Sequence, residues 1–274
     1  MVSFTSVFVE LAHVGPTVSA FYRMFFGGIV LGALAVVRGN RLWYGLKSLG
    51  LPFLCALFFS LDLFMWHRSI NYVGPGLATI LANFQVFFVA VWAVIFLKER
   101  LNRRLLISIP FAVAGLFMII RTDWLQPGVR VGLLFGLLAA VSYSFYILFL
   151  RKSQLIGQSK HTPIPNMAWI CLIAAAMLGT AVVIEADASF AIPDLQSWLA
   201  LLGLAVVGQG AGWVLISKGL PQVNASVAGL ALLLQPALAF IWDILFFARP
   251  TTGLEYAGAL IVLGAIYFGA TKKE

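Results

Sequence analysis

Long apolar runs separated by short polar or charged stretches dominate the pattern of this chain. A run of about 20 apolar residues is long enough to cross a bilayer core of about 30 Å as a helix. The runs, bracketed by charged residues or by Pro and Gly, lie at residues 1–13, 17–37, 49–70, 76–97, 105–121, 131–151, 165–184, 197–217, 225–247 and 253–270. The pattern predicts an all-α integral membrane protein with ten transmembrane helices.

The first of these segments is shorter than the others. Residues 1–13 are too few to cross a bilayer, whereas the sixth segment, its counterpart in the repeat described below, covers 131–151. We therefore expect one to two turns of the first helix to precede Met1. The sequence shows no basic region before this apolar stretch, as a cleavable signal peptide would.

Composition supports the membrane assignment. The chain has 274 residues, of which 62% are hydrophobic and 10% are charged, and its mean hydropathy is +0.99. A soluble domain carries about a quarter charged residues, so most of this surface is expected to face lipid. The two cysteines, Cys55 and Cys171, lie inside predicted helices, where we interpret them as small apolar residues.

The distribution of basic residues predicts the orientation. With the N-terminus inside, thirteen Lys and Arg residues fall on inner segments and three on outer ones. The inner residues are Arg38, Arg41, Lys47, Lys98, Arg100, Arg103, Arg104, Arg151, Lys152, Lys160, Lys218, Lys272 and Lys273. Cytoplasmic loops are enriched in Lys and Arg, so both termini are predicted to be cytoplasmic. Length and the lack of targeting signals fit a bacterial inner membrane, with a eukaryotic organelle as the alternative.

The chain also repeats itself at an offset of 150 residues. Gln85 falls on Gln235 and Trp92 on Trp242. The same offset pairs Val73 with Val223, Ala78 with Ala228 and Phe96 with Phe246. We expect two five-helix repeats, residues 1–125 and 126–274. Because five is odd, the second copy is inverted, the 5+5 arrangement in which carriers bind substrate at the midplane between repeats.

Three stretches carry a resemblance to a known family. They are AFYRMFFGGIVLGAL with Arg23, GPGLATILANFQVFFVAVWAVIFLKER, and its copy NASVAGLALLLQPALAFIWDILFFAR. In these the chain resembles the drug/metabolite transporter superfamily, specifically the ten-helix type with two EamA domains, over essentially its whole length. The resemblance implies transport of metabolites or amino acids, often export. The aromatic amino-acid exporters are the characterised relatives to consider first.

The chain departs from the family pattern in both copies. That pattern has a mid-helix Leu-x-Pro and a Gly-Glu about thirteen residues beyond the proline. The first copy has Val86 in place of the proline and keeps Glu99. The second keeps Pro236 and has Arg249 in place of the acid.

Ionisable groups at bilayer depth are costly and are functional candidates by default. Asp62 lies near the middle of the third segment and shares a helix face with Trp66. A carboxylate beside an indole would bind the ammonium of a zwitterion or take up a coupling proton. Alternatively, Asp62 forms a structural ion pair with Arg23 or with Arg68.

Amides and aromatic residues in the fourth and ninth segments are further candidates. Asn83 shares a face with small and aromatic residues, which suits a cavity wall and a tight helix interface equally. Gln85 and Trp92 are two turns apart and face one way, as do Gln235 and Trp242. These pairs either line a central cavity, where the amides would bind backbone-like groups of a substrate, or pack against the fifth and tenth segments.

Polar aromatic residues in the middle of helices complete the predicted substrate site. Tyr and Trp usually lie at membrane interfaces, and a mid-membrane one needs a polar partner or a water-filled cavity. The candidates of this kind, with the amide beside them, are Tyr143, Tyr146, Gln209 and Trp213. Residues expected to permit close packing, or a bend that serves a gate or hinge, are Gly208, Gly210, Gly212 and Pro236.

Motifs for other functions are not found in the sequence. It has no phosphate-binding glycine loop, no nucleophile elbow and no metal-ligand spacing. Asp62 and His67 are five residues apart and do not share a face. We therefore predict a non-enzyme without cofactor or metal, whose partners are a small molecule and the lipid bilayer, not nucleic acid, and which need not oligomerise.

These features predict a secondary transporter of small organic metabolites. The expected protein is an exporter or a facilitative carrier of an amino acid, aromatic or neutral. It would work by alternating access around a midplane substrate cavity between the two repeats. A proton-coupled drug or metabolite antiporter is the alternative. A channel-like facilitator would need a continuous polar stripe, whereas the polar residues here are isolated.

Overall fold

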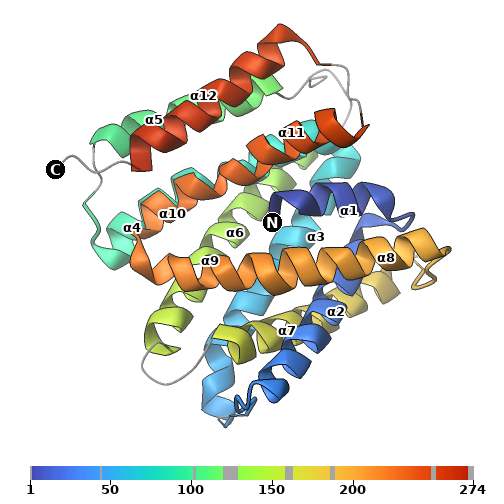
Figure 1. Ribbon diagram of the computed structural model, residues 1–274. Coiled ribbons are helices and arrows are strands. Elements are labelled where there is room, and N and C mark those ends of the chain that lie inside the picture. Colours follow the sequence, from blue (N-terminus) through green and yellow to red (C-terminus); the bar gives the residue numbers. More distant parts are fainter. Residues whose placement is uncertain are drawn as a thin grey trace. The chain divides into compact units, whose positions relative to one another are not determined.

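A computed structural model describes residues 2–43, 45–100, 103–119, 129–157, 163–185, 189–247 and 251–270. Figure 1 shows that these residues form an all-helical fold. The helices are η1 (Val2–Phe4), α1 (Thr5–Leu11), α2 (Pro16–Val37), η2 (Leu46–Leu49), α3 (Gly50–Asn83), α4 (Gln85–Leu97), α5 (Arg103–Ile119), α6 (Val129–Gly157), α7 (Pro163–Ile184), α8 (Leu195–Gly203), η3 (Leu204–Gly212), α9 (Trp213–Gly219), η4 (Leu220–Gln222), α10 (Ala225–Leu232), α11 (Leu234–Phe247) and α12 (Gly253–Ala270). The all-helical class predicted from the sequence is confirmed for this part of the chain.

Six stretches of the described residues are long and apolar enough to cross a membrane. They are Pro16–Val37, Leu46–Val73, Arg130–Ile156, Pro163–Ile184, Leu195–Gln222 and Ala225–Phe246. Shorter apolar helices lie at Val2–Leu11, Leu81–Leu97 and Gly253–Gly269. Many large apolar side chains stay exposed, such as Val183 at 75% and Leu260 at 70%, as expected for surfaces that face lipid. The count of ten spans and the cytoplasmic termini stay predictions.

The chain divides into two compact units, and each takes segments from both halves of the sequence. Unit 1 consists of Met1–Phe64 and Leu148–Gln222, and unit 2 of Met65–Ile147 and Val223–Glu274. Helices α3 and α6 contribute one end to each unit. The repeat boundary predicted at residue 125 lies in 120–128, outside the described residues.

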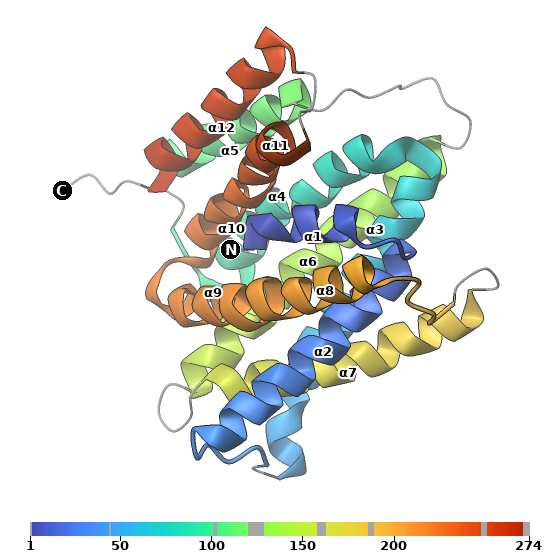
Figure 2. The same cartoon turned by 45° about the vertical axis from the view of Figure 1, so that its right-hand side comes forward.

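In unit 1, α2 packs along its counterpart α7, and the two lie side by side in both views (Figures 1 and 2). Both helices have 22 residues and begin with proline, whose fixed φ suits the first helical position. A Cβ on Gly28 would lie 2.7 Å from the Leu172 side chain and 3.2 Å from its backbone nitrogen. A small residue is therefore required where these helices cross. An apolar cluster that includes Ala12, Leu201 and Leu204 packs the end of α1 against α8.

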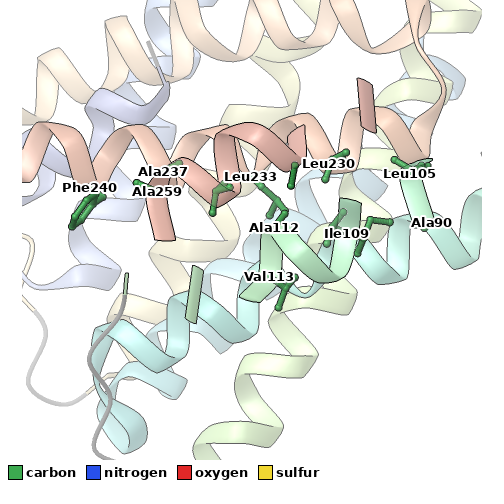
Figure 3. Close-up of a cluster of buried hydrophobic side chains, with 13 residues drawn as sticks. Ala90, Leu105, Ile109, Ala112, Val113, Leu230, Leu233, Ala237, Phe240 and Ala259 are labelled. Carbon is green, nitrogen blue, oxygen red and sulfur yellow. The ribbon is translucent and has the colours of Figure 1, made fainter. Parts of the chain in front are cut away.

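In unit 2, α5 packs along its counterpart α12 (Figures 1 and 2). A Cβ on Gly115 would lie 2.7 Å from the Gly258 carbonyl oxygen, so these backbones are nearly in contact. Figure 3 shows the core they share with α4, α10 and α11. Its buried members are Val86, Ala90, Leu105, Ile109, Ala112, Val113, Leu230, Leu233, Ala237, Phe240, Ala259, Val262 and Ala265. Helix α10 also packs on α4.

Equivalent points of the two copies carry a helix interruption. It lies at Phe84, between α3 and α4, and at Leu233, between α10 and α11. At both, the N–H bonds 3.1 Å to the carbonyl three residues earlier, a tighter turn than the α-helix makes. Pro236 lacks the N–H that would bond to residue 232, which accounts for the second interruption. The first copy has Val86 at that position, so its interruption does not depend on proline.

The third predicted segment does not end where the sequence indicated. The pattern placed a boundary between residues 70 and 76, yet α3 stays helical from Gly50 to Asn83. Pro75, inside that stretch, removes one backbone hydrogen bond. Membrane helices tolerate such a loss because neighbouring groups can satisfy the freed carbonyl.

Candidate functional site

A polar contact in the interior of unit 1 joins the two halves of the sequence. Arg23 on α2 donates a hydrogen bond from Nε to Oε1 of Gln209, over 2.9 Å. Gln209 is fully buried and lies in the π-helical segment η3, where the Trp213 N–H bonds to the Gly208 carbonyl five residues earlier. Such widened turns in helices are frequent at functional sites.

The ring of Phe59 lies beside the Arg23 guanidinium. Its Cζ lies 5.7 Å from the ring centroid of Phe59 on α3, within the range of a cation–π interaction. Phe59 in turn meets Trp213 edge to face, with the ring centroids 5.6 Å apart. The predicted site residue Trp213 is therefore placed beside Arg23 through a ring that the sequence analysis did not select.

Asp62 lies one turn beyond Phe59 on the same helix, so the two share a face. Its side chain is buried, at 8% exposure. The hydrogen bond from Arg23 Nε, however, goes to Gln209. The Arg23–Asp62 ion pair therefore stays a prediction, while the two side chains belong to one cluster with Gln209, Phe59 and Trp213, here called the Arg23 cluster.

The Arg23 cluster lies deep within the apolar spans. Gln209 lies at the middle of Leu195–Gln222, and Asp62 and Arg23 lie within about one helical turn of the middle of theirs. A charged side chain at the centre of a bilayer costs about 2.5–3.5 kcal/mol on insertion scales. The Gln209 amide and the Phe59 ring around Arg23 offset part of that cost.

The thiol of Cys171 lies beside the Gln209 amide. The Gln209 Nε2 lies 3.6 Å from Sγ of Cys171 on α7, so the amide has a partner at each end. Both cysteines of the chain are free and buried. In the part of the chain that the structure describes, no three His, Cys, Asp or Glu side chains gather as a metal site would need.

The repeated glutamines both belong to unit 2. Gln85, at the start of α4, is 1% exposed, and its Nε2 donates to the Gly229 carbonyl over 3.3 Å. Its Oε1 is buried without a hydrogen-bond partner among the described residues. The Nε2 of Gln235, next to the interruption before α11, is likewise buried without a hydrogen-bond partner among the described residues. Each copy thus holds an unsatisfied amide atom beside its helix break.

The repeated tryptophans make matching contacts within their helices. Trp92 stacks on Phe96 with ring centroids 5.5 Å apart, and Trp242 contacts Phe246 at 6.3 Å. Trp92 also donates a hydrogen bond from Nε1 to Ser144 Oγ over 3.1 Å. This bond gives Trp92 the polar partner that a tryptophan at membrane depth requires.

The remaining predicted site residues of unit 2 are dispersed. Asn83 donates to the carbonyl of Thr79 one turn earlier, over 2.8 Å. Tyr143 stacks with the fully buried Tyr146, ring centroids 6.0 Å apart. Trp66 packs against an apolar cluster formed by Val73, Ala78 and Leu81. Their role in substrate binding stays a prediction.

The glycines predicted as gates permit close packing. A Cβ on Gly208 would lie 2.5 Å from the Thr5 side chain, and one on Gly212 would lie 2.5 Å from Val2. These two glycines bring η3 against the N-terminal segment, while Gly210 has Ala205 O at 3.4 Å from its Cβ position. Their role in gating, and that of Pro236 as a hinge, stays a prediction.

Two carboxylates have structural roles that the sequence analysis did not predict. Glu99 accepts hydrogen bonds from the N–H groups of Ala225 and Ser226, at 2.8 and 3.4 Å. It thereby caps α10, whose own N-cap residue Asn224 makes no side-chain cap. The acid that the first copy retains from the family pattern therefore holds the start of the ninth predicted segment. Its counterpart Arg249 lies outside the described residues.

Asp194 is the second of these carboxylates, at the start of α8. It accepts from His13 Nδ1 over 2.7 Å and from the Ser197 N–H over 2.7 Å. These hydrogen bonds, that from His13 first, lower the pKa of Asp194. The contact ties the end of α1 to the start of α8 at the surface of unit 1. Acid and histidine are 181 residues apart in the sequence, so no local pattern could reveal them.

Comparison with known proteins places the chain in a family. The model of the EamA-like transporter family matches residues 1–121 and 130–270. An uncharacterised transporter of Archaeoglobus fulgidus is 24% identical over 95% of this chain and 89% of its own. The pseudopaline exporter CntI of Pseudomonas aeruginosa is 24% identical over 92% and 86%. A probable amino-acid metabolite efflux pump of Salmonella typhimurium is 26% identical over 70% and 66%.

A solved crystal structure shows the same fold. It matches with a TM-score of 0.81 at 18% identity and covers 98% of this chain and 92% of its own. Because the family model spans both halves of the sequence, and because the helices are apolar and long enough to cross a membrane, the chain belongs to the EamA-like transporter family of the drug/metabolite transporter superfamily, a family of multi-pass integral membrane proteins.

Proposed function

We propose that this protein is a secondary transporter that exports a small organic metabolite, with an amino acid as the substrate class. The observation that carries the proposal is the Arg23 cluster, in which Arg23 from the first half and Gln209 from the second meet over 2.9 Å near the middle of their spans. Polar groups that are costly at this depth are kept where a solute binds.

The relatives support this class of substrate. One is named as an exporter of pseudopaline and another as a probable efflux pump for amino-acid metabolites. Guanidinium, carboxylate and amide groups within one cluster match the carboxylate and ammonium that an amino acid presents. Phe59 and Trp213 supply an apolar wall beside them.

The transport cycle we propose is alternating access. A substrate site that takes residues from both repeats changes its exposure when the repeats rock about it. Arg23 comes from the first repeat and Gln209 from the second, and both belong to unit 1. The membrane we propose is the bacterial inner membrane, with both termini in the cytoplasm as the basic residues indicate.

Coupling depends on Asp62, the one acidic residue of the Arg23 cluster. A carboxylate with no proton-transfer role leaves the carrier indifferent to a pH gradient. A carboxylate that takes up and releases a proton in each cycle makes the protein a proton antiporter. One substitution, Asp62→Asn, separates these possibilities because it keeps the size of the side chain and removes the titratable group.

Flux through purified protein in liposomes tests the proposal. Labelled phenylalanine and alanine would be supplied with and without a pH gradient to wild type, Asp62→Asn and the control Glu10→Gln, which neutralises an exposed acid on α1. Saturable flux in wild type and in the control supports the function. Gradient dependence lost in Asp62→Asn would identify the antiporter. No saturable amino-acid flux in wild type would refute the substrate class.

A further inference from the structure

Basic residues gather at the start of α5, in unit 2. The stretch 98–104 holds four of them, Lys98, Arg100, Arg103 and Arg104, here called the α5 basic cluster, and one acid, Glu99. The Glu99 carboxylate accepts hydrogen bonds from the start of α10. Lys98, Arg100 and Arg103 are exposed and form no ion pair in the part of the chain that the structure describes. This end of α5 therefore carries a concentrated positive charge, on the side that the basic residues assign to the cytoplasm.

The exposed face of α5 begins within this cluster. Arg103, Leu106, Ile107, Pro110 and Phe111 are exposed, and their spacing of three and four residues places them on one side of the helix. Leu106 is 51% exposed and Phe111 60%. From Arg103 to Phe111 the helix rises about 12 Å, close to half of a hydrocarbon core of about 30 Å. A guanidinium therefore lies at the head of an apolar stripe that is nearly one leaflet deep.

Helix α12 places aromatic rings beside the charges. The Cζ of Arg104 lies 5.4 Å from the ring centroid of Phe268, near the end of α12, within the range of a cation–π interaction. The two helices approach closely here, because a Cβ on Gly269 would lie 2.7 Å from Ser108 Oγ. Phe268 is 44% exposed and Tyr267 75%. Aromatic residues at the end of a span favour the level of the lipid headgroups, so charges and rings meet at that level.

An anionic phospholipid matches these features. Its phosphate forms charge-assisted hydrogen bonds with guanidinium groups through their paired N–H donors. Clusters of about four to eight Lys and Arg beside a membrane helix attract anionic lipids. A soluble anion would use the charges and leave the apolar stripe uncovered, whereas a phospholipid covers both.

We propose that the α5 basic cluster is a binding site for an anionic phospholipid. The headgroup phosphate binds to the guanidinium groups of Arg103 and Arg104, and Lys98 and Arg100 add attraction at longer range. An acyl chain lies along the exposed stripe of α5, and Phe268 flanks the headgroup. The site shares no residue with the Arg23 cluster, so it does not depend on which solute is transported.

Lipid binding to the wild-type protein is the first test. The purified protein in an uncharged detergent is titrated with dioleoyl phosphatidylglycerol or dioleoyl phosphatidylcholine, which share their acyl chains and differ in net charge. Native mass spectrometry counts the bound lipids. Each basic residue strengthens the attraction to anionic lipid about fivefold, so we expect the first phosphatidylglycerol to bind at least about tenfold more tightly than the first phosphatidylcholine. Equal affinities would overturn the assignment.

Paired variants separate this site from the general positive charge of the protein, which is +8. Arg103→Gln with Arg104→Gln removes two charges from the site. Arg38→Gln with Arg41→Gln removes two exposed charges after α2 and serves as the control. We expect the first pair to weaken phosphatidylglycerol binding at least about tenfold and the second less than about twofold. Equal losses would assign the preference to overall charge and overturn the site.

A second pair and a competitor complete the test. Arg100→Gln with Arg103→Gln changes exposed side chains only and should also weaken phosphatidylglycerol binding at least about tenfold, which keeps the test valid if the Arg104 variant does not fold. Unchanged binding in this pair would count against the site. Glycerol phosphate, which has a phosphate and no acyl chain, should not displace the lipid at equal concentration. Displacement would indicate a site for free phosphate and would overturn the lipid assignment.

Discussion

Two buried glutamines of unit 1 allow one substitution to be compared in two environments. Gln209 is 0% exposed and accepts a hydrogen bond from Arg23 Nε. Gln154 on α6 is 7% exposed, and its Nε2 is buried without a hydrogen-bond partner among the described residues. Methionine has a similar length and volume and forms no strong hydrogen bond. We predict that Gln209→Met destabilises the protein, whereas Gln154→Met does not.

The magnitudes follow from the bonds that are lost. A hydrogen bond to a charged group contributes about 1.5–3 kcal/mol in soluble proteins, whereas interhelical bonds in membranes average about 0.6 and reach about 1.7 kcal/mol. Because the donor Arg23 is charged, we expect Gln209→Met to lower the free energy of unfolding by about 1–2 kcal/mol, near the upper end of the membrane range. Removing the unsatisfied Gln154 amide leaves the free energy of unfolding unchanged or raises it by up to about 1 kcal/mol.

The assay is reversible unfolding in detergent micelles, followed by tryptophan fluorescence, with size-exclusion chromatography to verify a monodisperse starting state. A double-mutant cycle with Arg23→Met isolates the coupling between Arg23 and Gln209. We expect a coupling energy of about 1 kcal/mol for this pair and none between Arg23 and Gln154. Equal losses from Gln209→Met and Gln154→Met would refute the reasoning.

Three further outcomes are expected. Gly115→Ala should lower the free energy of unfolding by about 1–3 kcal/mol, because its Cβ would lie 2.7 Å from a backbone oxygen. The control Gly264→Ala, whose Cβ would have nothing within 4 Å, should not lower it. Similar melting curves of the two variants in micelles would contradict this prediction. Glu99→Gln should cost about 1 kcal/mol through the weakened cap of α10, measured by denaturant unfolding, and an unchanged midpoint would argue against it. The pKa of Asp194 is lowered in the fold, so its contact with His13 contributes fully to stability above the ordinary Asp pKa of about 3.9, and this contribution is lost as the pH falls through the lower folded pKa. Asp194→Asn should remove that part of the acid dependence of the unfolding temperature. A pH profile identical to that of wild type would count against this prediction.

The helices could be predicted from the sequence because each depends on a local property. Apolar length and the bounding charges identified every long span, and α2 and α7 match their predicted ranges within about two residues. The end of the third segment was misplaced, since Gly and Pro read as a turn in a single sequence although α3 continues to Asn83. The widened turn at η3 has no local signal beyond its glycines.

The membership of the Arg23 cluster was only partly predictable. Polarity at membrane depth singled out Arg23, Asp62 and Gln209 individually, but the choice of partner for Arg23 depends on how α2 packs against η3, which no local pattern encodes. Phe59 is apolar, so a search for polar residues at membrane depth did not identify it as a site residue. The repeat located Gln85 and Gln235, and it could not tell that each has an unsatisfied amide atom.

The mixed origin of the two units bears on how the protein is made. Helix α2 leaves the ribosome long before α7, and α5 long before α12, so the close-packed faces at Gly28 and Gly115 are without their partners for most of synthesis. The apolar core of unit 2 includes residues of α12, the last helix that the structure describes. We therefore expect α2 and α5 to gain these packing partners only after the second half of the chain has been synthesised.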